Sequence, residues 1–566
     1  MRVSARDMMK AGRFETFETP VRHAPVVEPA PGRPRINKLA VLMVVIFGVL
    51  AARAVQLSLA GQPESARIAP RAAPAPVVAR ADLVDRNGVL LATMLPSWIL
   101  AGEPEKIWDP AQAARRLATV LPDLDIAATE RRLRSKAKFV HLKPGLTASQ
   151  RRAVHDLGLA GISFEREQRR VYPNGMLAGH ALGGVNRENA GAGGVESALD
   201  AELRRAGVGR VELSLDTRIQ YALESELADA AWAAKAKGGA AVILDGHTGE
   251  TLALASWPQI DPNTPGAGSE TARLNRASGA VYEMGSTLKP FTVAIALDTG
   301  NLRLTERFDL TEAFTIDGRT FRDPHPFVGP ATIREAVAHS SNVAMAELAL
   351  RVGAQRQRDY LGKLGLLERT SIQIGGAPAP LLPRTESRLT TGVLGFGHGL
   401  AVSMVSLAGA YTVFTNNGAR ATPTLLRHRA GEKVRLTPVF TPLAAQETLQ
   451  LMRDVVIEGT ARRADLRGLD IAGKTGTAEK IGADGKYAPD VLLSSFAAIF
   501  PARAPRYVIV LALDEPQRTP ENGNLATGGA VAAPAVGRVV ARITPFLATT
   551  PVHGSAEKRG GGDRRP

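Results

Sequence analysis

The chain contains no cysteine among its 566 residues. Disulfide bonds and thiolate chemistry are therefore excluded. Its ten histidines form no H-E-x-x-H pattern and no cluster with the spacing of metal ligands, so we expect no metal ion. Asp323 and His325, in the segment FRDPHPF, are interpreted as part of a loop rather than as a metal site.

Lysine is scarce beside arginine. The chain holds 15 lysines and 55 arginines, with a net charge of +15 and a pI near 10.2. A positive net charge of this size can indicate nucleic-acid binding. The basic residues are scattered, however, and aromatic residues are not interleaved with them. We interpret the charge as affinity for an anionic envelope and predict no nucleic-acid partner.

A long apolar run extends from Leu39 to Leu59. As a helix, 21 residues span about 31 Å, which matches a bilayer core. The first 38 residues carry eight Lys/Arg and four Asp/Glu, so the positive-inside rule leaves the rest of the chain outside. We predict a cytoplasmic tail (1–38) and an uncleaved transmembrane anchor (39–60). The alternative is a signal peptide cleaved near Ala52-Arg53-Ala54, for which the leader is too long.

Three short motifs follow in an informative order. Ser286 and Lys289 fit S-x-x-K, Ser340 and Asn342 fit S-x-N, and K-T-G-T begins at Lys474. The motifs are separated by 54 and 134 residues. Each motif alone is weak, but K-T-G occurs once, and the three together form a set known from serine acyltransferases. A second S-x-x-K, Ser135-Lys136-Ala137-Lys138, has no partner motifs, and we interpret it as a solvated helix face.

The first motif has the chemistry of an activated nucleophile. A serine hydroxyl attacks only when a neighbouring base takes its proton. An apolar rhythm through Phe291 and Ile295 predicts a helix, and residues three apart on a helix share a face, so Ser286 and Lys289 lie together. Ser286 then sits at the helix N-terminus, where free N–H groups favour negative charge. Lys289 faces a desolvated interior, which favours its neutral, basic form.

The other two motifs supply substrate contacts. Short helical runs, Thr332–His339 and Val343–Val352, flank the second motif, so Ser340 and Asn342 are placed on a turn facing a shared cleft. Ser340 can relay a proton and Asn342 can bind a substrate amide, although Ser and Asn there can also simply cap a helix. The third motif lies on a predicted edge strand, 469–478, suited to an extended peptide. On this strand Lys474 attracts a carboxylate, and Thr475 and Thr477 supply hydroxyls. Gly476 allows the backbone of a bound peptide to approach closely. The backbone N–H groups of Ser286 and Thr477 form an oxyanion hole.

The chain beyond the anchor divides into four parts. We predict a proline-rich linker (61–79), a pedestal (80–212), a catalytic domain (213–546) and a disordered tail (547–566). Strands occur as hairpins near both ends of the catalytic domain, with helices between them. The predicted fold class is therefore α/β (α+β), an antiparallel sheet packed between helices.

At these motifs the chain resembles the class B penicillin-binding proteins, and more closely their division-specific members. The resemblance covers about residues 80–516. It includes the pedestal signatures Arg80–Gly88, Arg170–Gly175 with His180, and Gly193–Glu196, whose buried charges are expected to pair with one another. In the catalytic domain it includes segments 238–257, 274–292, 396–418 (expected as a long helical stretch behind the site) and 491–516 (expected as a closing strand pair).

The resemblance implies a membrane-anchored D,D-transpeptidase that cross-links peptidoglycan stem peptides through an acyl-Ser286 intermediate and is acylated by β-lactams. It implies the penicillin-binding transpeptidase fold, no metal or organic cofactor, and a location in the bacterial inner membrane at the division septum, with the catalytic domain periplasmic. The implied partners are a multi-spanning (FtsW-type) glycosyltransferase and other divisome membrane proteins. The alternatives are an elongation-type relative, a non-catalytic penicillin-binding sensor or scaffold, and a secreted β-lactamase, which conflicts with the pedestal and the anchor.

Overall fold

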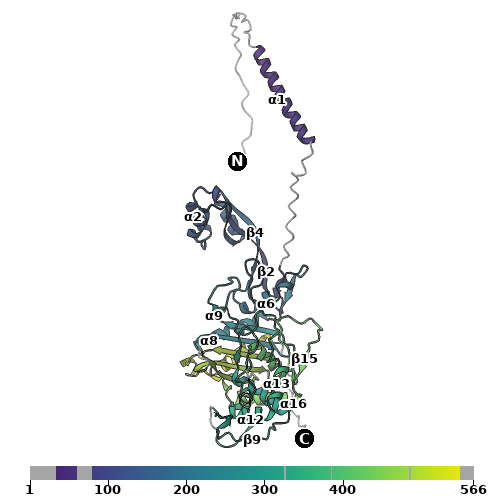
Figure 1. The fold of residues 1–566 in the computed structure, drawn as a ribbon, viewed down its shortest axis with the longest axis vertical. Coiled ribbons are helices and arrows are strands. Elements are labelled where there is room, and N and C mark those ends of the chain that lie inside the picture. Colours follow the sequence, from purple (N-terminus) through teal and green to yellow (C-terminus); the bar gives the residue numbers. More distant parts are fainter. Residues whose placement is uncertain (1–32, 60–79, 324–326, 384, 483–485, 548–566) are drawn as a thin grey trace, which may run out of the picture. The chain divides into compact units, whose positions relative to one another are not determined.

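The computed structural model describes residues 33–59, 80–323, 327–383, 385–482 and 486–547 (Figure 1). The chain forms two units, Met1–Val77 and Val78–Pro566. The predicted linker (61–79) and nearly all of the two predicted tails lie outside the described residues.

The described part of the first unit is one helix, α1 (Arg33–Leu59). Its segment Asn37–Gln56 has a mean hydropathy of 2.2 and is exposed along its whole length. By length and composition this segment can cross a membrane. The helix begins at Arg33, so the last residues of the predicted tail are helical as well.

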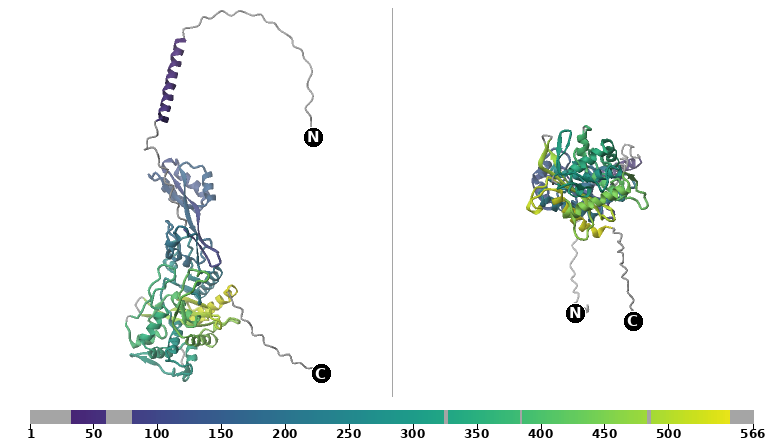
Figure 2. Two further views of the ribbon diagram at one scale, coloured as in Figure 1. Left: turned by 90° about the vertical axis from the view of Figure 1, so that its right-hand side faces the viewer. Right: turned by 90° about the horizontal axis from the view of Figure 1, so that it is seen from below.

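The pedestal contains a five-stranded sheet in which β2 pairs with β1, β3 and β4 (Figure 2). The part of the pedestal formed by β3, α2, α3, α4 and the end of β2 has a hydrophobic core of its own, around Leu100, Leu117 and Leu146. The base of the pedestal, including Leu83 and Leu91, belongs instead to the large core of the catalytic domain. The elements are β1 (Asp82–Val84), β2 (Leu90–Gly102), α2 (Pro110–Val120), α3 (Ile126–Leu133), β3 (Val140–Leu146), α4 (Ala148–Asp156), β4 (Ile162–Val171), α5 (Gly179–Leu182), α6 (Gly194–Ala198), α7 (Asp200–Leu203) and β5 (Arg210–Glu212).

Buried charges join the pedestal signatures, as the sequence predicts. Glu196 is fully buried and accepts hydrogen bonds from Arg80 Nε at 2.5 Å, Arg170 Nε at 2.7 Å and Tyr172 OH at 3.2 Å. Removing one partner from such a cluster leaves an uncompensated buried charge, which costs about 3–5 kcal/mol. His180 Nε2 lies 2.9 Å from the carbonyl oxygen of Pro258 and so connects the pedestal base to the catalytic domain.

The catalytic domain is built on a five-stranded antiparallel sheet with the order β16-β17-β18-β6-β7. Every residue of the inner strands β6 and β18 is buried, which explains their nearly continuous apolar sequences. The predicted hairpins at both ends of the domain are confirmed, and they lie side by side. The strands are β6 (Gly238–Asp245), β7 (Thr251–Trp257), β16 (Ala472–Ile481), β17 (Tyr487–Phe500) and β18 (Tyr507–Asp514).

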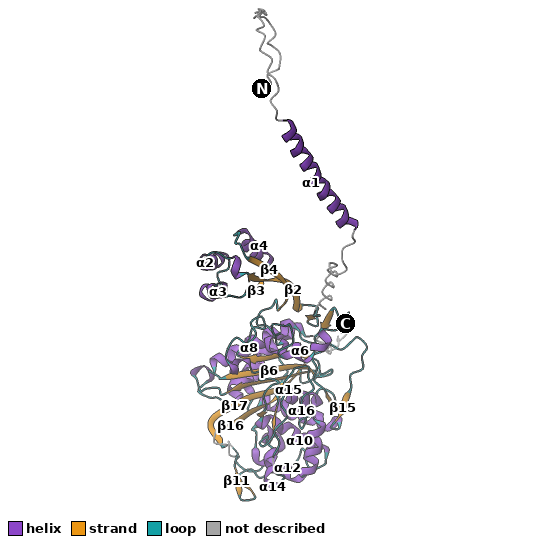
Figure 3. Cartoon of the chain, turned by 45° about the horizontal axis from the view of Figure 1, so that its top comes forward, coloured by secondary structure: helices purple, strands orange, loops and turns teal. Residues whose placement is uncertain are grey.

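Helices cover both faces of this sheet, as expected (Figure 3). The helices α8 (Thr217–Ala233) and α17 (Gly528–Ile543) pack on one face, and α15 (Met404–Tyr411) packs on the other. The remaining helices lie between β7 and β16 in the sequence. They are α9 (Glu270–Arg273), α10 (Lys289–Asp298), α11 (Ile333–Ala338), α12 (Asn342–Val352), α13 (Ala354–Lys363), α14 (Arg388–Leu394) and α16 (Pro442–Ile457).

Short elements complete the domain. Four strand pairs tie loops to one another: β8 (Tyr282–Glu283) with β13 (Ala401–Val402), β9 (Arg307–Phe308) with β12 (Ala331–Thr332), β10 (Phe314–Ile316) with β11 (Arg319–Phe321), and β14 (Ala419–Ala421) with β15 (Leu436–Pro438). The 3-10 turns are η2 (Pro104–Lys106), η3 (Gly285–Leu288), η4 (Thr412–Phe414), η5 (Arg462–Ala464), η6 (Pro520–Asn522) and η7 (Thr544–Phe546).

Three local predictions need correction. The long helical stretch expected over 396–418 is wrong, because Gly397 and Gly399 have φ values of +90° and +84°, which an α-helix excludes. Only α15 and η4 are helical there. Ser135 lies beyond the C-terminal end of α3, in an exposed bend and not on a helix face. The edge strand runs over Ala472–Ile481, three residues later than predicted.

Candidate active site

The three motifs meet at one cavity of about 670 Å³. Ser286 lies in η3, directly before α10, and Ser340 lies between α11 and α12. Thr475 and Thr477 come from β16, the edge strand of the sheet. Ser286, Ser340, Asn342, Thr475 and Thr477 all line the cavity.

Close backbone packing fixes the start of the nucleophile segment. Gly285, directly before Ser286, has a φ of +53°, and a Cβ added to it would lie 3.3 Å from Ala478 of β16. A Cβ on Gly476 would lie 2.7 Å from the carbonyl oxygen of Met284. The close approach of η3 to β16 therefore depends on glycine at both positions.

Lys289 is the buried centre of the site. Its Nζ donates hydrogen bonds to the carbonyl oxygen of Ser340 at 2.5 Å, to Asn342 Oδ1 at 2.8 Å and to Ser340 Oγ at 3.0 Å. Burial and the charge of Lys474 hold the pKa of Lys289 well below its usual value, and the carboxylate of Asp323 opposes them only in part. A lysine with a lowered pKa can act as a base near neutral pH.

Ser340 links the nucleophile to both lysines. Its Oγ donates to Ser286 Oγ at 3.1 Å and accepts from Lys289 Nζ and, at 2.8 Å, from Lys474 Nζ. Burial lowers the pKa of Lys474 to about 7. The side-chain amines of Lys289 and Lys474 both bind Ser340 Oγ, and they repel each other when both are protonated. Protonation of one lysine therefore depends on protonation of the other.

Asp323 holds the S-x-N turn in place and was missed as a site residue by the sequence analysis. Its Oδ1 accepts from the backbone N–H groups of Asn342 at 2.5 Å and Val343 at 3.0 Å, and its Oδ2 accepts from Ser341 Oγ at 2.6 Å. These bonds support Ser340, whose φ of +64° is unfavourable for a residue with a side chain. The expected loop position of Asp323 is correct, and among the described residues no group of three or more His, Cys, Asp or Glu could hold a metal ion.

The alternative that residues of the S-x-N motif only cap a helix is correct for its middle residue, Ser341. Ser341, not Ser340, accepts a hydrogen bond from the N–H of Ala344 and caps α12. The side chains of Ser340 and Asn342 are therefore available to the cavity and to Lys289.

The edge strand carries the third motif. Thr475 Oγ1 lies 2.6 Å from Thr460 Oγ1, and Thr477 Oγ1 accepts from the N–H of Gly528 at 3.1 Å. One side of β16 pairs with β17, and among the strands of the described residues none pairs with its other side. The same cavity is also lined by five ionisable side chains that sequence reasoning did not assign to the site: His339, His398, Arg462, Arg463 and Glu479.

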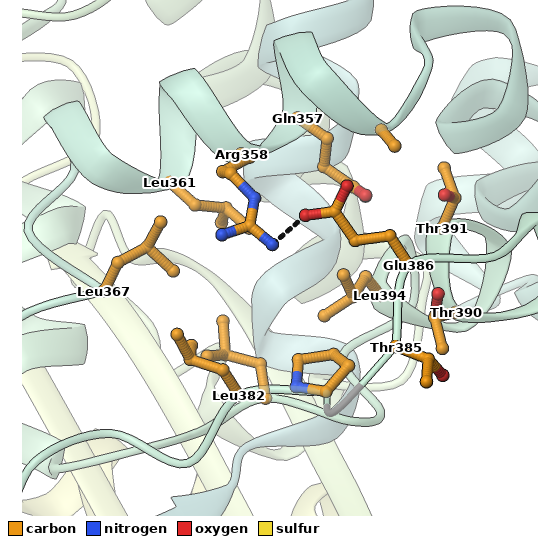
Figure 4. A pocket seen from close by; sticks show the side chains of 13 residues that line it. Gln357, Arg358, Leu361, Leu367, Leu382, Thr385, Glu386, Thr390, Thr391 and Leu394 are labelled. Atoms are coloured by element: carbon orange, nitrogen blue, oxygen red, sulfur yellow. Dashed lines mark hydrogen bonds and ion pairs between the residues drawn. The ribbon is translucent and has the colours of Figure 1, made fainter.

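A second hollow lies between α13, α14 and the segment around Leu382 (Figure 4). Leucine side chains such as Leu361 and Leu394 line it, and Arg358 forms an ion pair with Glu386 across it. Its volume of about 40 Å³ admits only a few water molecules. None of the thirteen lining residues belongs to the three motifs, so we interpret this hollow as a packing gap.

The fold and the serine–lysine site define a penicillin-binding transpeptidase. Residues 239–541 match the family described as penicillin binding protein transpeptidase domain, and residues 76–222 match the penicillin-binding protein dimerisation domain. The chain belongs to this family, as the motifs predict, and its class B, division-specific character is also confirmed.

Individual relatives agree with this assignment. The chain is 39% identical over 480 residues to the probable peptidoglycan D,D-transpeptidase FtsI of Caulobacter vibrioides, covering 83% of this chain and 81% of the relative. It is 31% identical to the probable peptidoglycan D,D-transpeptidase PenA of Neisseria gonorrhoeae, covering 93% and 95%. Among solved structures, penicillin binding protein 3 of Mycobacterium tuberculosis in complex with aztreonam superposes with a TM-score of 0.66 at 26% identity, covering 83% and 96%.

Proposed function

We propose that this protein is a peptidoglycan D,D-transpeptidase that forms cross-links through an acyl-Ser286 intermediate during septal wall synthesis. The observation that carries the proposal is the hydrogen-bond chain from Ser286 Oγ through Ser340 Oγ to the two buried lysines. Relatives at 39% and 31% identity are named peptidoglycan D,D-transpeptidases.

In the acylation step, Ser286 Oγ attacks the carbonyl carbon of the penultimate D-alanine of a stem peptide. Lys289 takes the hydroxyl proton, either directly or through Ser340 Oγ, which hydrogen-bonds to both. An ester bond forms, the peptide C–N bond breaks, and the proton passes to the amine of the leaving D-alanine. β-Lactams acylate the same oxygen, and their amide C–N bond opens in the same way.

Substrate contacts come from the other two motifs. Asn342 binds a backbone amide of the stem peptide, and Thr475 binds the terminal carboxylate. The buried Lys474 attracts this carboxylate by its charge, and Gly476 allows close approach. The free side of β16 suits an extended peptide. The N–H groups of Ser286 and Thr477 stabilise the oxyanion of the tetrahedral intermediate.

The proposed location and partners of the enzyme are supported by α1 and by the relatives. We propose that α1 anchors the protein in the bacterial inner membrane in a single pass, with a cytoplasmic tail (1–38), a pedestal (80–212) and a periplasmic catalytic domain (213–546). The partners proposed are the FtsW-type glycosyltransferase and other divisome membrane proteins. A fluorescent fusion should gather at the septum; a side-wall signal throughout the cell cycle would favour the elongation-type alternative.

The activity is tested with the purified full-length protein in detergent. A thioester analogue of the donor peptide, supplied with a primary amine, should yield an amide product, and benzylpenicillin should abolish its formation. A protein that binds penicillin but never turns over the thioester would instead be a sensor or scaffold.

A further inference from the structure

The loop Phe396–Gly399, between α14 and β13, borders the catalytic cavity. Phe396 and His398 line the same cavity as Ser286 and Ser340. The acylation step described above makes no use of His398.

This loop is packed directly against the nucleophile segment. A Cβ on Gly397 would lie 2.0 Å from the carbonyl oxygen of Gly285, the residue before Ser286. The N–H of Gly399 donates to Glu283 Oε1 at 3.0 Å, and β13 pairs with β8, which contains Glu283. His398 is therefore held in a fixed place beside the nucleophile segment.

The imidazole of His398 lies among aromatic rings and charges. Its centroid is 5.3 Å from the ring of Phe396 and 5.5 Å from that of Tyr487, and its Nδ1 is 3.9 Å from Glu283 Oε2. Burial lowers the pKa of His398; Glu283 and Glu479 oppose this, while Lys289 and Arg319 add to it. A neutral imidazole carries a free lone pair on one ring nitrogen.

The second half of a transpeptidation needs a proton acceptor. A primary amine of the lysine type has a pKa of about 10.4, so at pH 7 only roughly one molecule in two thousand is unprotonated and able to attack. The carboxylate of Glu479 lines the cavity, on the edge strand, and is placed to attract such an ammonium group.

We propose that His398 takes a proton from the acceptor ammonium, which Glu479 attracts into the cavity, and so sets the preference for an amine over water. The inference rests on the proposed function of Ser286. The acceptor R–NH₃⁺ gives one proton to His398 and attacks the ester carbonyl as R–NH₂. The new C–N bond forms, the Ser286 C–O bond breaks, and Ser286 Oγ takes a second amine proton through Lys289. His398 then releases its proton to solvent.

The test measures how the acyl-enzyme divides between amine and water. Full-length protein is given an acyl-D-alanyl thioester with N-acetyl-lysine as the amine, and the amide and acid products are separated by chromatography. At pH 7, His398→Gln should lower the amide-to-acid ratio at least about tenfold. Both products come from the same acyl-enzyme, so this ratio does not depend on the rate of acylation. The exposed His155 offers the matched control, and His155→Gln should leave the ratio unchanged.

The pH profile separates proton transfer from mere positioning. Between pH 7 and 9 the wild-type aminolysis rate should be nearly flat, whereas that of His398→Gln should rise about tenfold per pH unit as the free amine is formed. A ratio unchanged in His398→Gln, or lowered by the same factor at every pH, would overturn the proposal. Failure of penicillin to label the wild-type protein would instead overturn the proposed function.

A second variant, Glu479→Gln, tests the proposal even if His398→Gln does not fold. Glu479 is exposed, so Glu479→Gln should fold normally. It should raise the KM for the amine at least about threefold. An unaltered KM would show that Glu479 does not attract the acceptor.

Discussion

The four-residue pattern S-x-x-K occurs both at Ser286 and at Ser135, and these two copies have opposite surroundings. Lys289 is 1% exposed and shares hydrogen bonds with the turn that contains Ser340. Lys138 and Ser135 are exposed, in the segment between α3 and β3. The first copy begins a buried helix, α10, and the second follows the end of an exposed one.

The difference shows that spacing alone does not make a nucleophile. Burial shifts Lys289 towards its neutral form. Ser340, 54 positions after Ser286, and Lys474, 134 positions after Ser340, complete the hydrogen-bond chain. A serine and a lysine in water lack both conditions, because the solvated ammonium keeps its proton near neutral pH.

The largest effect is expected from removing each serine in turn. Ser286→Ala should abolish labelling by a fluorescent penicillin, because the acylated oxygen is gone. Ser135→Ala should label like the wild type. A denaturing gel reads both outcomes, and a retained band in Ser286→Ala would contradict the assignment.

The next largest effect is expected from replacing the lysine of each S-x-x-K copy, Lys289 or Lys138, by arginine. Lys289→Arg should slow acylation at least about 100-fold, because a guanidinium stays protonated and cannot accept the serine proton. Lys138→Arg, in the exposed copy, should leave the rate unchanged. Stopped-flow or quenched-gel kinetics measure both, and near-normal acylation of Lys289→Arg would show that another group is the base.

A smaller effect should come from the carboxylate that holds the S-x-N turn. Asp323→Asn replaces charge-assisted hydrogen bonds by neutral ones, and acylation should fall about tenfold, or about 1.4 kcal/mol. The charge of Asp323 raises the pKa of Lys289, so its loss alone would favour the neutral base. A slower rate therefore reports the turn geometry. Asp309→Asn, at an exposed loop carboxylate, is the matched control, and equal rates in the two variants would refute this role.

The last comparison concerns stability and its dependence on pH, not the rate of acylation. Lys474 has a native pKa of about 7, whereas an unfolded lysine titrates near 10.4. Between these values the unfolded chain binds more protons, so stability rises with pH. Relative to Lys474→Met, the wild-type unfolding free energy should gain up to about 1.4 kcal/mol per pH unit from pH 7 to 10. Urea unfolding measures it, with Ser135→Ala as the control; a pH-independent difference would contradict the lowered pKa.

The sequence was sufficient for the features that depend on local pattern. The hairpins at both ends of the catalytic domain follow from alternation and glycine placement. The start of α10 and the edge strand were predicted to within three residues, since the helix begins at Lys289, after the 3-10 turn that holds Ser286, and the strand begins at Ala472. The family and fold were predicted from the three motifs and are confirmed.

The residues that were missed act across space. Asp323 reaches the turn at Ser341 from 18 residues away through a loop that has no sequence signature. His398 lies in a stretch expected to be helical, and positive φ at Gly397 and Gly399 turns the chain there instead. Hydrophobic periodicity cannot detect either case, because it records which face is buried and not which polar group a loop approaches.

The most direct test of the account is the position of the acyl group itself. The full-length protein is treated with benzylpenicillin, digested with trypsin and analysed by tandem mass spectrometry. The penicilloyl adduct should be found on the peptide 277–303, with fragment ions placing it on Ser286, and it should be absent from peptides that contain Ser135. An adduct on any other residue would contradict the claim that the buried, three-motif copy is the nucleophile.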